Sequence, residues 1–331
     1  MSKGKVSLIG IDKLSLSFGV KDFAGEPSSW SKHFDSFSPD GVKVTETFSR
    51  TVELADGPSV FCSVQRRLDV SERAPVRAKI EFNPSRVVDP AGFSLAGVEA
   101  SMDAAGVAVR SVFPWVQPFE MAGYSSYKVK RIDVAKDFHG VLSPGVLIRG
   151  LGPIPRKWAR RNSVWADPHS HGAQTLSVGS GAGMVRLYDK FEETEHKVEP
   201  GTVRWETEAH GDWAANYGAI RTAADLNDEN VATLAADRWE WSLMGVEIKS
   251  TAGVVDVLAR SDLSGRQQAT FLGWLVTQNT PYAFVPASKA LAKYRRIQRE
   301  LNIVLGPDVL NSVGFSSRLD WESGTVVTRV S

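Results

Sequence analysis

Short segments in the first two thirds of the chain alternate between apolar and polar residues. Successive side chains of a β-strand point to opposite faces, so this alternation predicts strands with one buried face. The alternating segments are residues 42–50, 76–83, 127–138 and 202–210, and residues 5–20 mix alternation with near-continuous apolar runs. Residues 174–179 and 184–191 flank the glycine-rich sequence SGAG, which predicts a β-hairpin.

The last third of the chain is predicted to be mainly helical. Candidate helices are residues 212–224, 228–241, 265–277 and 287–304, and earlier ones are expected within 91–111 and 146–151. In the final helix, Leu291, Tyr294, Ile297 and Leu301 recur at spacings of three and four and form one apolar stripe. The other faces carry basic residues, namely Lys289, Lys293, Arg295, Arg296 and Arg299. These cations could form an ordinary solvated face or a face that contacts DNA.

Together the patterns predict an α+β protein with mixed or antiparallel sheets and helices packed on one face. The other face of the sheet is expected to be polar and to hold the functional site. We expect three regions: a strand-rich N-terminal half at 1–125, a central half with the informative motifs at 126–250, and a helical C-terminal region at 251–331.

Composition narrows the function mainly by exclusion. Of the 331 residues, 42% are hydrophobic and 23% are charged, as in an ordinary globular protein. The net charge is only +1, so nucleic-acid binding would have to rest on local basic patches. A single cysteine, Cys62, excludes an internal disulfide and a cysteine-based zinc site, and fits a reducing cytoplasm. No secretory signal and no apolar run of membrane-spanning length is seen, so we expect a cytoplasmic protein without a membrane partner.

Three central strands each place charged groups on one face and apolar groups on the other. In residues 128–138 the charged face is formed by Arg131, Asp133 and Asp137, with Ala135 between the acids. In the segments that follow, the same rule groups Arg186, Tyr188 and Lys190, and then Arg204, Glu206, Glu208 and His210. Each face alone could simply meet water, but three in succession favour a sheet face with a chemical role.

If the three strands are neighbours, their polar groups suit phosphodiester chemistry. Asp133, Asp137 and Glu206 supply carboxylate oxygens, which Mg²⁺ or Mn²⁺ prefers, and alternation also permits Glu208 in place of Glu206. Tyr188 would be the attacking oxygen. The ordinary pKa of a tyrosine is about 10, so Arg186 and Lys190, or a cation, would favour the phenolate and bind phosphate oxygens. No nucleotide-binding P-loop motif is present.

At these residues the chain resembles a known family. The sequences RIDVAKDF, TLSVGSGAGMVRLYDKFEE and VRWETEAHG are similar, in this order, to replication initiators of the Rep_trans type, which act in rolling-circle plasmids and filamentous phages. The resemblance covers about a quarter of the chain. It implies that Tyr188 becomes linked to the 5′-phosphate of a nicked strand, with Asp133, Asp137 and Glu206 as the metal-binding acids. Two departures are the turn GSGAG, which lacks a basic residue, and FEETE after the tyrosine strand.

The same resemblance implies the partners. They would be origin DNA, single-stranded or extruded at the nick, with a host helicase and polymerase in a bacterial cytoplasm, and the chain could act as a homodimer. A basic stretch with one tryptophan is predicted to contact DNA, namely Arg156, Lys157, Trp158, Arg160 and Arg161.

Three alternatives stay open at this point. The first is the tyrosine nickase class with a metal-binding histidine pair, for which the chain offers only His169 and His171 in a Pro-Gly-Ser context. The second is a glycoside hydrolase, because paired carboxylates on strands also suit that chemistry. The third is a DNA-binding protein without enzymatic activity, in which Tyr188 would be structural and Trp158 would stack on a base.

Overall fold

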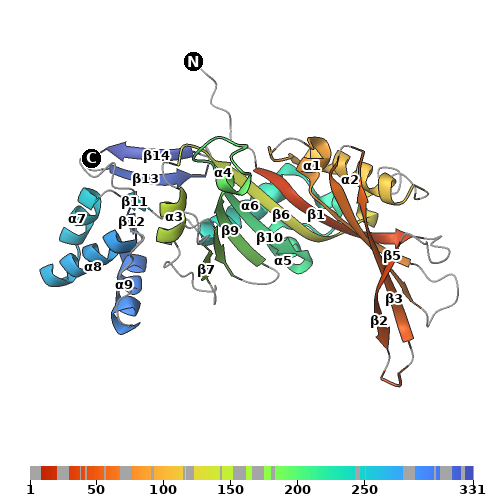
Figure 1. The fold of residues 1–331 in the computed structure, drawn as a ribbon, viewed down its shortest axis with the longest axis horizontal. Helices are drawn as coiled ribbons and strands as arrows, with labels where there is room; N and C mark the ends of the chain where they lie inside the picture. The colour runs from red at the N-terminus through yellow and green to blue at the C-terminus, as the bar shows by residue number, and fades with distance from the viewer. Residues whose placement is uncertain are drawn as a thin grey trace, which may run out of the picture. The chain divides into compact units, whose positions relative to one another are not determined.

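The protein has an α+β fold with two sheets in the described part of the chain (Figure 1). The computed structural model describes residues 9–20, 30–37, 39–41, 43–55, 57–67, 76–90, 93–114, 116, 123–141, 144–151, 162–165, 175–179, 183–242, 247–249, 251–278, 288–301, 303–305, 315–321 and 325–330. The strands of the large sheet follow the order β2-β3-β4-β5-β1-β6-β10-β9-β8-β7, and those of the small sheet β12-β11-β13-β14. The chain divides into two compact units. Unit 1 comprises Met1–Leu8, Lys136–Thr207 and Asp237–Ser331, and unit 2 comprises Ile9–Ala135 and Glu208–Ala236.

Unit 2 is built on antiparallel strands covered by helix α2. Its own strands are β1 (Ile9–Val20), β2 (Ser31–Phe37), β3 (Lys43–Glu53), β4 (Ser59–Arg67) and β5 (Val76–Phe82). Its helices are α1 (Pro84–Val88), α2 (Val98–Val112), α5 (Gly211–Gly218) and the 3₁₀ turns η1 (Tyr124–Ser126) and η2 (Ala223–Asp225). Helix α2 packs on β1, β4 and β5, and alternate apolar residues of these strands are buried. Burial of this apolar area is the main stabilising contribution to the unit.

Two strands and one helix run from one unit into the other. They are β6 (Lys128–Phe138), β10 (Val203–His210) and α6 (Asp228–Ser242). All seven residues from Val203 to Ala209 are buried, so β10 is covered on both of its faces. The charged side chains of β10 are therefore held by partners inside the protein, and they do not simply face water.

Unit 1 contains the predicted hairpin. Strands β8 (Thr175–Val178) and β9 (Gly183–Asp189) pair antiparallel, with Thr175 opposite Tyr188 and Val178 opposite Val185. Strand β7 (Asn162–Trp165) adds to β8, and the short helix α4 (Lys190–Glu193) follows β9 directly. Helix α3 (Pro144–Leu151) contacts β8 and β9. The hairpin thus positions the tyrosine strand by main-chain hydrogen bonds on the β8 side.

Aromatic side chains pack behind β6 and β10 in unit 1. The ring of Trp205 lies 5.2 Å from that of Trp321, Trp239 stacks on Trp321 at 5.0 Å, and Phe138 stacks on Trp239 at 5.1 Å. The ammonium of Lys136 lies 4.8 Å from the Trp321 ring, which gives this buried cation a favourable electrostatic contact. Trp205 and Trp239 are buried core residues, and Trp321 is partly buried against them.

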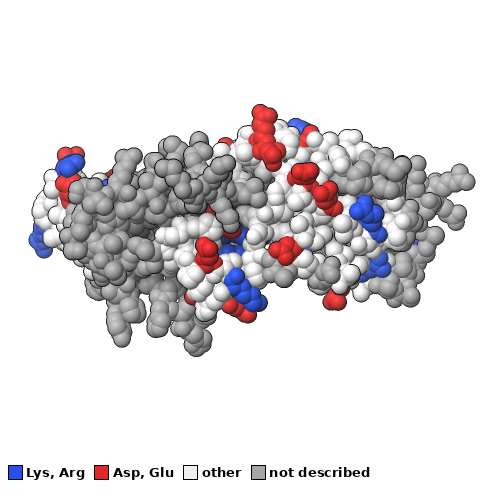
Figure 2. Space-filling model, turned by 90° about the horizontal axis from the view of Figure 1, so that it is seen from above, with Lys and Arg blue, Asp and Glu red and all other residues white. Residues whose placement is uncertain are grey.

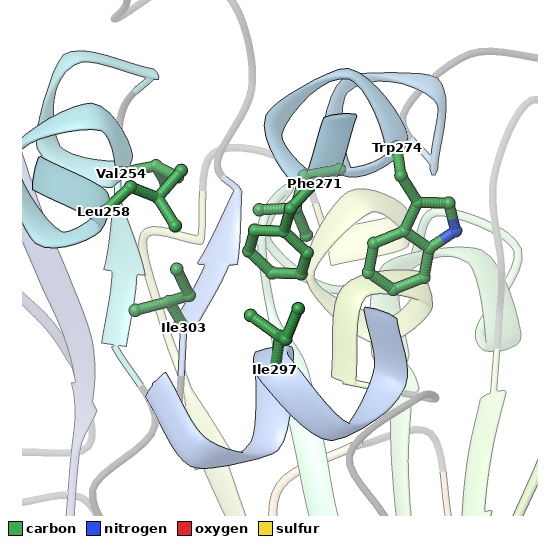
Figure 3. Packing of buried hydrophobic residues seen from close by; sticks show 7 residues of the cluster. Val254, Leu258, Phe271, Trp274, Ile297 and Ile303 are labelled. Carbon is green, nitrogen blue, oxygen red and sulfur yellow. The ribbon is translucent and has the colours of Figure 1, made fainter. Parts of the chain in front are cut away.

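The C-terminal part of unit 1 combines three helices with the small sheet. The helices are α7 (Thr251–Ala259), α8 (Gly265–Gln278) and α9 (Ser288–Leu301), and the strands are β11 (Glu247–Lys249), β12 (Ile303–Leu305), β13 (Phe315–Asp320) and β14 (Thr325–Val330). β11 is parallel to β12 and antiparallel to β13, so the small sheet is mixed. One apolar cluster joins the three helices and β12 (Figure 3), and its members are Val254, Leu258, Phe271, Trp274, Leu275, Ile297 and Ile303.

The predicted fold class is confirmed, but the sequence-based elements omit three strands of the large sheet, namely β2, β4 and β7, and they differ further in the last third of the chain. The expected helix at 212–224 is wrong in length, because α5 ends at Gly218 and Ala219 adopts a left-handed conformation with φ of 54°. The region expected to be helical also contains strands β12, β13 and β14, which are too short or too weakly patterned to be recognised. The threefold division of the chain stays a prediction.

Candidate functional site

Strand β9 presents Tyr188 at the side of the sheet opposite to its apolar residues. Val185 and Leu187 are buried, whereas Arg186 and Tyr188 are partly exposed, as the alternation of a strand requires. β10 is the neighbour of β9 in the sheet, and it places Glu206 beside this pair.

The Tyr188 hydroxyl donates a hydrogen bond to Glu206. The distance from Tyr188 Oη to Glu206 Oε2 is 3.2 Å. The second oxygen, Oε1, accepts from Arg186 Nη1, also at 3.2 Å, and the Glu206 side chain is only 7% exposed. Both oxygens of one buried carboxylate are thus engaged, one by the phenol and the other by a cation. We refer to Tyr188, Glu206 and Arg186 as the tyrosine triad.

Lys190 adds a second positive charge beside the Tyr188 ring. Its Nζ lies 5.6 Å from the ring centroid and 2.6 Å from Glu193 Oε2. The lysine is buried, and its backbone N–H donates to the carbonyl of Thr202. Asp189 accepts hydrogen bonds from the backbone N–H groups of Phe191 and Glu192, which fixes the start of α4 directly after the tyrosine strand.

Asp137 and Arg204 form a separate buried pair in unit 1. Arg204 Nε and Nη2 donate to the two oxygens of Asp137 at 2.6 and 2.8 Å, so the contact is bidentate. The arginine side chain is 3% exposed and the aspartate side chain 19% exposed. Such geometry is the strongest form of a charged hydrogen bond in proteins.

Unit 2 contains a second charged network, which includes Asp133. Arg131 donates to both oxygens of Asp133 at 2.8 and 2.5 Å and also pairs with Glu208 at 3.0 Å. The other oxygen of Glu208 lies 2.7 Å from His210 Nε2. Burial raises the pKa of Asp133, Arg131 offsets part of this effect, and the negative charge of Glu208 adds to the rise. Burial alone would lower the pKa of Arg131, but Asp133 and Glu208 raise it on balance.

The arrangement of acids does not match a preformed metal site. Carboxylate oxygens are suitable ligands for Mg²⁺ or Mn²⁺, but Asp133, Asp137 and Glu206 each accept hydrogen bonds from an arginine. Among the described residues, no group of three or more His, Cys, Asp or Glu side chains is arranged to hold a metal ion. The sequence pattern contained the arginines but did not show that they pair with these acids.

Several predicted site residues lie outside the described residues. The basic stretch, comprising Arg156, Lys157, Trp158, Arg160 and Arg161, is one such segment, and the histidine pair at 169 and 171 is another. Of the predicted catalytic and metal-binding residues, Glu206 contacts both Tyr188 and Arg186, and Lys190 lies beside the tyrosine ring. Asp137 pairs with Arg204, and Asp133 belongs to the network in unit 2.

Comparison with known proteins gives few matches. No protein-family model and no curated protein matches the chain. A solved structure to which the chain is similar is a rolling circle replication initiator protein from Geobacillus stearothermophilus, with 13% sequence identity and a TM-score of 0.32 over 84% of this chain and 98% of that one. Within the part of the chain that is described, no helix has both the length and the apolar character needed to span a membrane.

Proposed function

We propose that this protein nicks one strand of DNA through Tyr188 and later rejoins it, as an initiator of rolling-circle replication. The observation that carries the proposal is the hydrogen bond from the Tyr188 hydroxyl to the buried Glu206 carboxylate, which Arg186 holds on its other oxygen. A tyrosine on a strand is commonly structural. A purely structural phenol, however, does not need to donate to a buried carboxylate that an arginine holds in place. This contact, together with the order of the motifs, favours a nucleophile.

The reaction follows from the tyrosine triad. Tyr188 Oη attacks the phosphorus of a phosphodiester while its proton passes to Glu206, which is within the distance required of a general base. The bond from phosphorus to the 3′-oxygen breaks, and this oxygen takes a proton to become a 3′-hydroxyl. The 5′-phosphate stays on Tyr188 as a phosphotyrosyl ester. Attack by a 3′-hydroxyl on this ester reverses the step, and no nucleotide cofactor is consumed.

Positive side chains beside the phenol would stabilise the charge that develops on the phosphate. Arg186 binds the same carboxylate as the phenol, and Lys190 Nζ lies 5.6 Å from the centroid of the Tyr188 ring, so both cations are near the tyrosine. We propose that Arg186 contacts a nonbridging phosphate oxygen when DNA is bound. The 5′ polarity of the linkage rests on the family resemblance and on the need for a 3′-hydroxyl as primer.

A divalent cation remains part of the proposal, and the acids that the sequence pattern suggests as candidate ligands are Asp133, Asp137 and Glu206. Mg²⁺ or Mn²⁺ would supply charge neutralisation at the phosphate. The arginines paired with these acids would first have to move, because each carboxylate is already neutralised by a guanidinium. Nicking activity measured with EDTA and with increasing Mg²⁺ or Mn²⁺ therefore tests two possibilities. Either the paired arginines take the place of a metal ion, or a metal ion displaces them.

The DNA substrate would be single-stranded or extruded at the nick, because a phenol on a sheet cannot reach a stacked duplex without distorting it. We propose that the basic stretch at 156–161 guides this strand. The setting would be the cytoplasm of a bacterial host, where a helicase and a polymerase continue replication and where the protein could act as a homodimer.

The test is a nicking assay on supercoiled DNA that carries the sequence flanking the protein's own gene. Wild type, Tyr188→Phe and Tyr217→Phe are compared with Mg²⁺, with Mn²⁺ and with EDTA. Tyr217 is a partly exposed tyrosine on α5 and serves as the matched control. Wild type and Tyr217→Phe should yield open circles, and Tyr188→Phe should yield none. If Tyr188→Phe nicks as wild type does, the phenol is structural. If no protein cuts but all bind DNA, the protein is a binding module.

A further inference from the structure

Helix α9 concentrates the positive charge of the protein. Five of its 14 residues are Lys or Arg and one is Glu, so the helix carries +4, whereas the whole chain carries +1. The rest of the chain therefore has a net charge of −3. On the face that Figure 2 shows, the Lys and Arg side chains of the described residues lie among Asp and Glu side chains and do not form one continuous basic patch.

The apolar side of α9 is fixed against the core of the C-terminal helices. Ile297 is buried and points toward Phe271 of α8 (Figure 3), while Leu291, Tyr294 and Leu301 pack against the same cluster. The amide of Gln298 donates to the carbonyl of Ile303, which ties the end of the helix to β12. This packing orients the helix, so its remaining faces are directed to solvent.

The solvent side of α9 is an array of cations. Lys289, Lys293, Arg295 and Arg296 are exposed. Lys289, Lys293 and Arg296 are four and three residues apart, so they form one stripe that is about 10 Å long at the rise of an α-helix. Arg296 lies 3.6 Å from Glu300, but both side chains are more than 60% exposed, and such a pair exchanges readily with another anion.

The side chains of α9 favour a phosphate backbone over unstacked bases. Proteins that bind single strands combine cations with exposed aromatic rings on which bases stack. The one aromatic residue of α9, Tyr294, lies 5.5 Å from Trp274 and 6.4 Å from Phe271, so it is turned toward the core. A rigid row of cations without a stacking surface suits the regular charges of duplex DNA.

We propose that the exposed face of α9 binds the phosphate backbone of duplex DNA. The contact is independent of base sequence, because only phosphates are recognised. It would hold double-stranded DNA on the protein, a task distinct from cleavage at Tyr188, and it does not depend on Tyr188 being a nucleophile.

The test compares two variants of the full chain that lose the same charge. One replaces Lys289, Lys293 and Arg296 of α9 by Gln. The control replaces three exposed cations of unit 2 by Gln, namely Lys128, Lys130 and Arg221. Binding to a fluorescent duplex of about 20 base pairs is measured by anisotropy from about 50 mM to about 200 mM salt.

Three lost phosphate contacts should lower the slope of log affinity against log salt by about 2.7. Over this salt range, the affinity of wild type should then fall about 40-fold more than that of the α9 variant. The control variant should keep the slope of wild type, and an α9 variant with Arg at both lysine positions should bind as wild type does. Thermal melting checks that each variant is folded.

Equal slopes for the α9 variant and wild type would overturn the proposal. So would a loss of affinity that is larger for a single-stranded oligonucleotide than for the duplex. Adduct formation on a single-stranded oligonucleotide is recorded in parallel. An α9 variant that loses duplex binding but still forms adduct supports the inference, and a wild type that binds duplex through α9 but never forms adduct refutes only the nicking proposal.

Discussion

The buried pair of Asp137 and Arg204 allows a quantitative prediction. Replacing Asp137 by Ala leaves a guanidinium that is 3% exposed without the carboxylate that accepts two of its hydrogen bonds. Breaking such a pair from one side costs about 3–5 kcal/mol. Because Asp137 is 19% exposed and water can reach the vacated position, we expect a value near the lower end, about 3 kcal/mol. This is a large fraction of the stability of an ordinary domain.

The assay is urea unfolding followed by both tryptophan fluorescence and far-UV circular dichroism. Seven of the ten tryptophans, including Trp205 next to Arg204 in β10, belong to unit 1, so fluorescence reports mainly on this unit. Circular dichroism reports on both units, and transitions that do not coincide would show that the units unfold separately. Asp137→Asn keeps one acceptor oxygen and should cost less than Asp137→Ala. The double replacement Asp137→Leu with Arg204→Met removes both charges and should recover stability to within about 1–2 kcal/mol of wild type.

The result that would refute this reasoning is a small effect of the single replacement. If Asp137→Ala changes the free energy of unfolding by less than about 1 kcal/mol, other groups or water compensate the Arg204 guanidinium once the carboxylate is removed. If the double replacement is less stable than Asp137→Ala, Arg204 stabilises unit 1 through contacts other than this pair.

Three further predictions concern single side chains. Glu206→Gln keeps the shape of the general base but removes its charge. The rate of single-turnover nicking should therefore fall about 10²–10⁴-fold. The affinity for DNA should stay within about threefold of wild type, since a tenfold change in affinity corresponds to about 1.4 kcal/mol. Burial would raise the pKa of Glu81, but two lysines lower this pKa below the ordinary value of 4.5. The ionised Glu81 therefore stabilises the protein above pH 4.5, and this contribution is lost as the pH falls through the lowered pKa. Thermal melting at falling pH should therefore show a shallower loss for Glu81→Gln than for wild type, and identical profiles would contradict the assignment. Phe271→Ala removes a fully buried ring from the C-terminal cluster and should cost about 3–5 kcal/mol in urea unfolding, whereas Val255→Ala, on the exposed side of α7, should cost less than about 0.5 kcal/mol.

Much of the central sheet could be predicted because strand alternation has a simple period. The segment from Arg131 to Phe138 forms a strand and β8 and β9 pair antiparallel, as expected, and Tyr188 lies on the same face as Arg186. The apolar stripe of α9 packs inward for the same kind of reason, since a helix repeats every 3.6 residues.

The partners of the charged residues could not be predicted in the same way. Alternation places Arg204 and Glu206 on one face but does not tell which acid each arginine contacts, because that depends on the register between strands. The pairs of Asp137 with Arg204 and of Glu206 with Arg186 join residues 67 and 20 positions apart. For this reason the expected cluster of acids around a metal stays a proposal.

The strands of the small sheet could not be predicted for a different reason, because they carry too few residues for a period to be visible.

The most direct test of the central claim is to identify the residue that carries DNA after the reaction. The protein is incubated with a single-stranded oligonucleotide from the DNA flanking its gene, treated with nuclease and trypsin, and examined by mass spectrometry. Trypsin cleaves after Arg186 and Lys190, so the peptide at 187–190 contains Tyr188 as its one tyrosine. We predict a nucleotide 5′-phosphate on this peptide, absent in Tyr188→Phe. A nucleotide on any other peptide, or cleaved DNA with no nucleotide on the protein, would contradict the account.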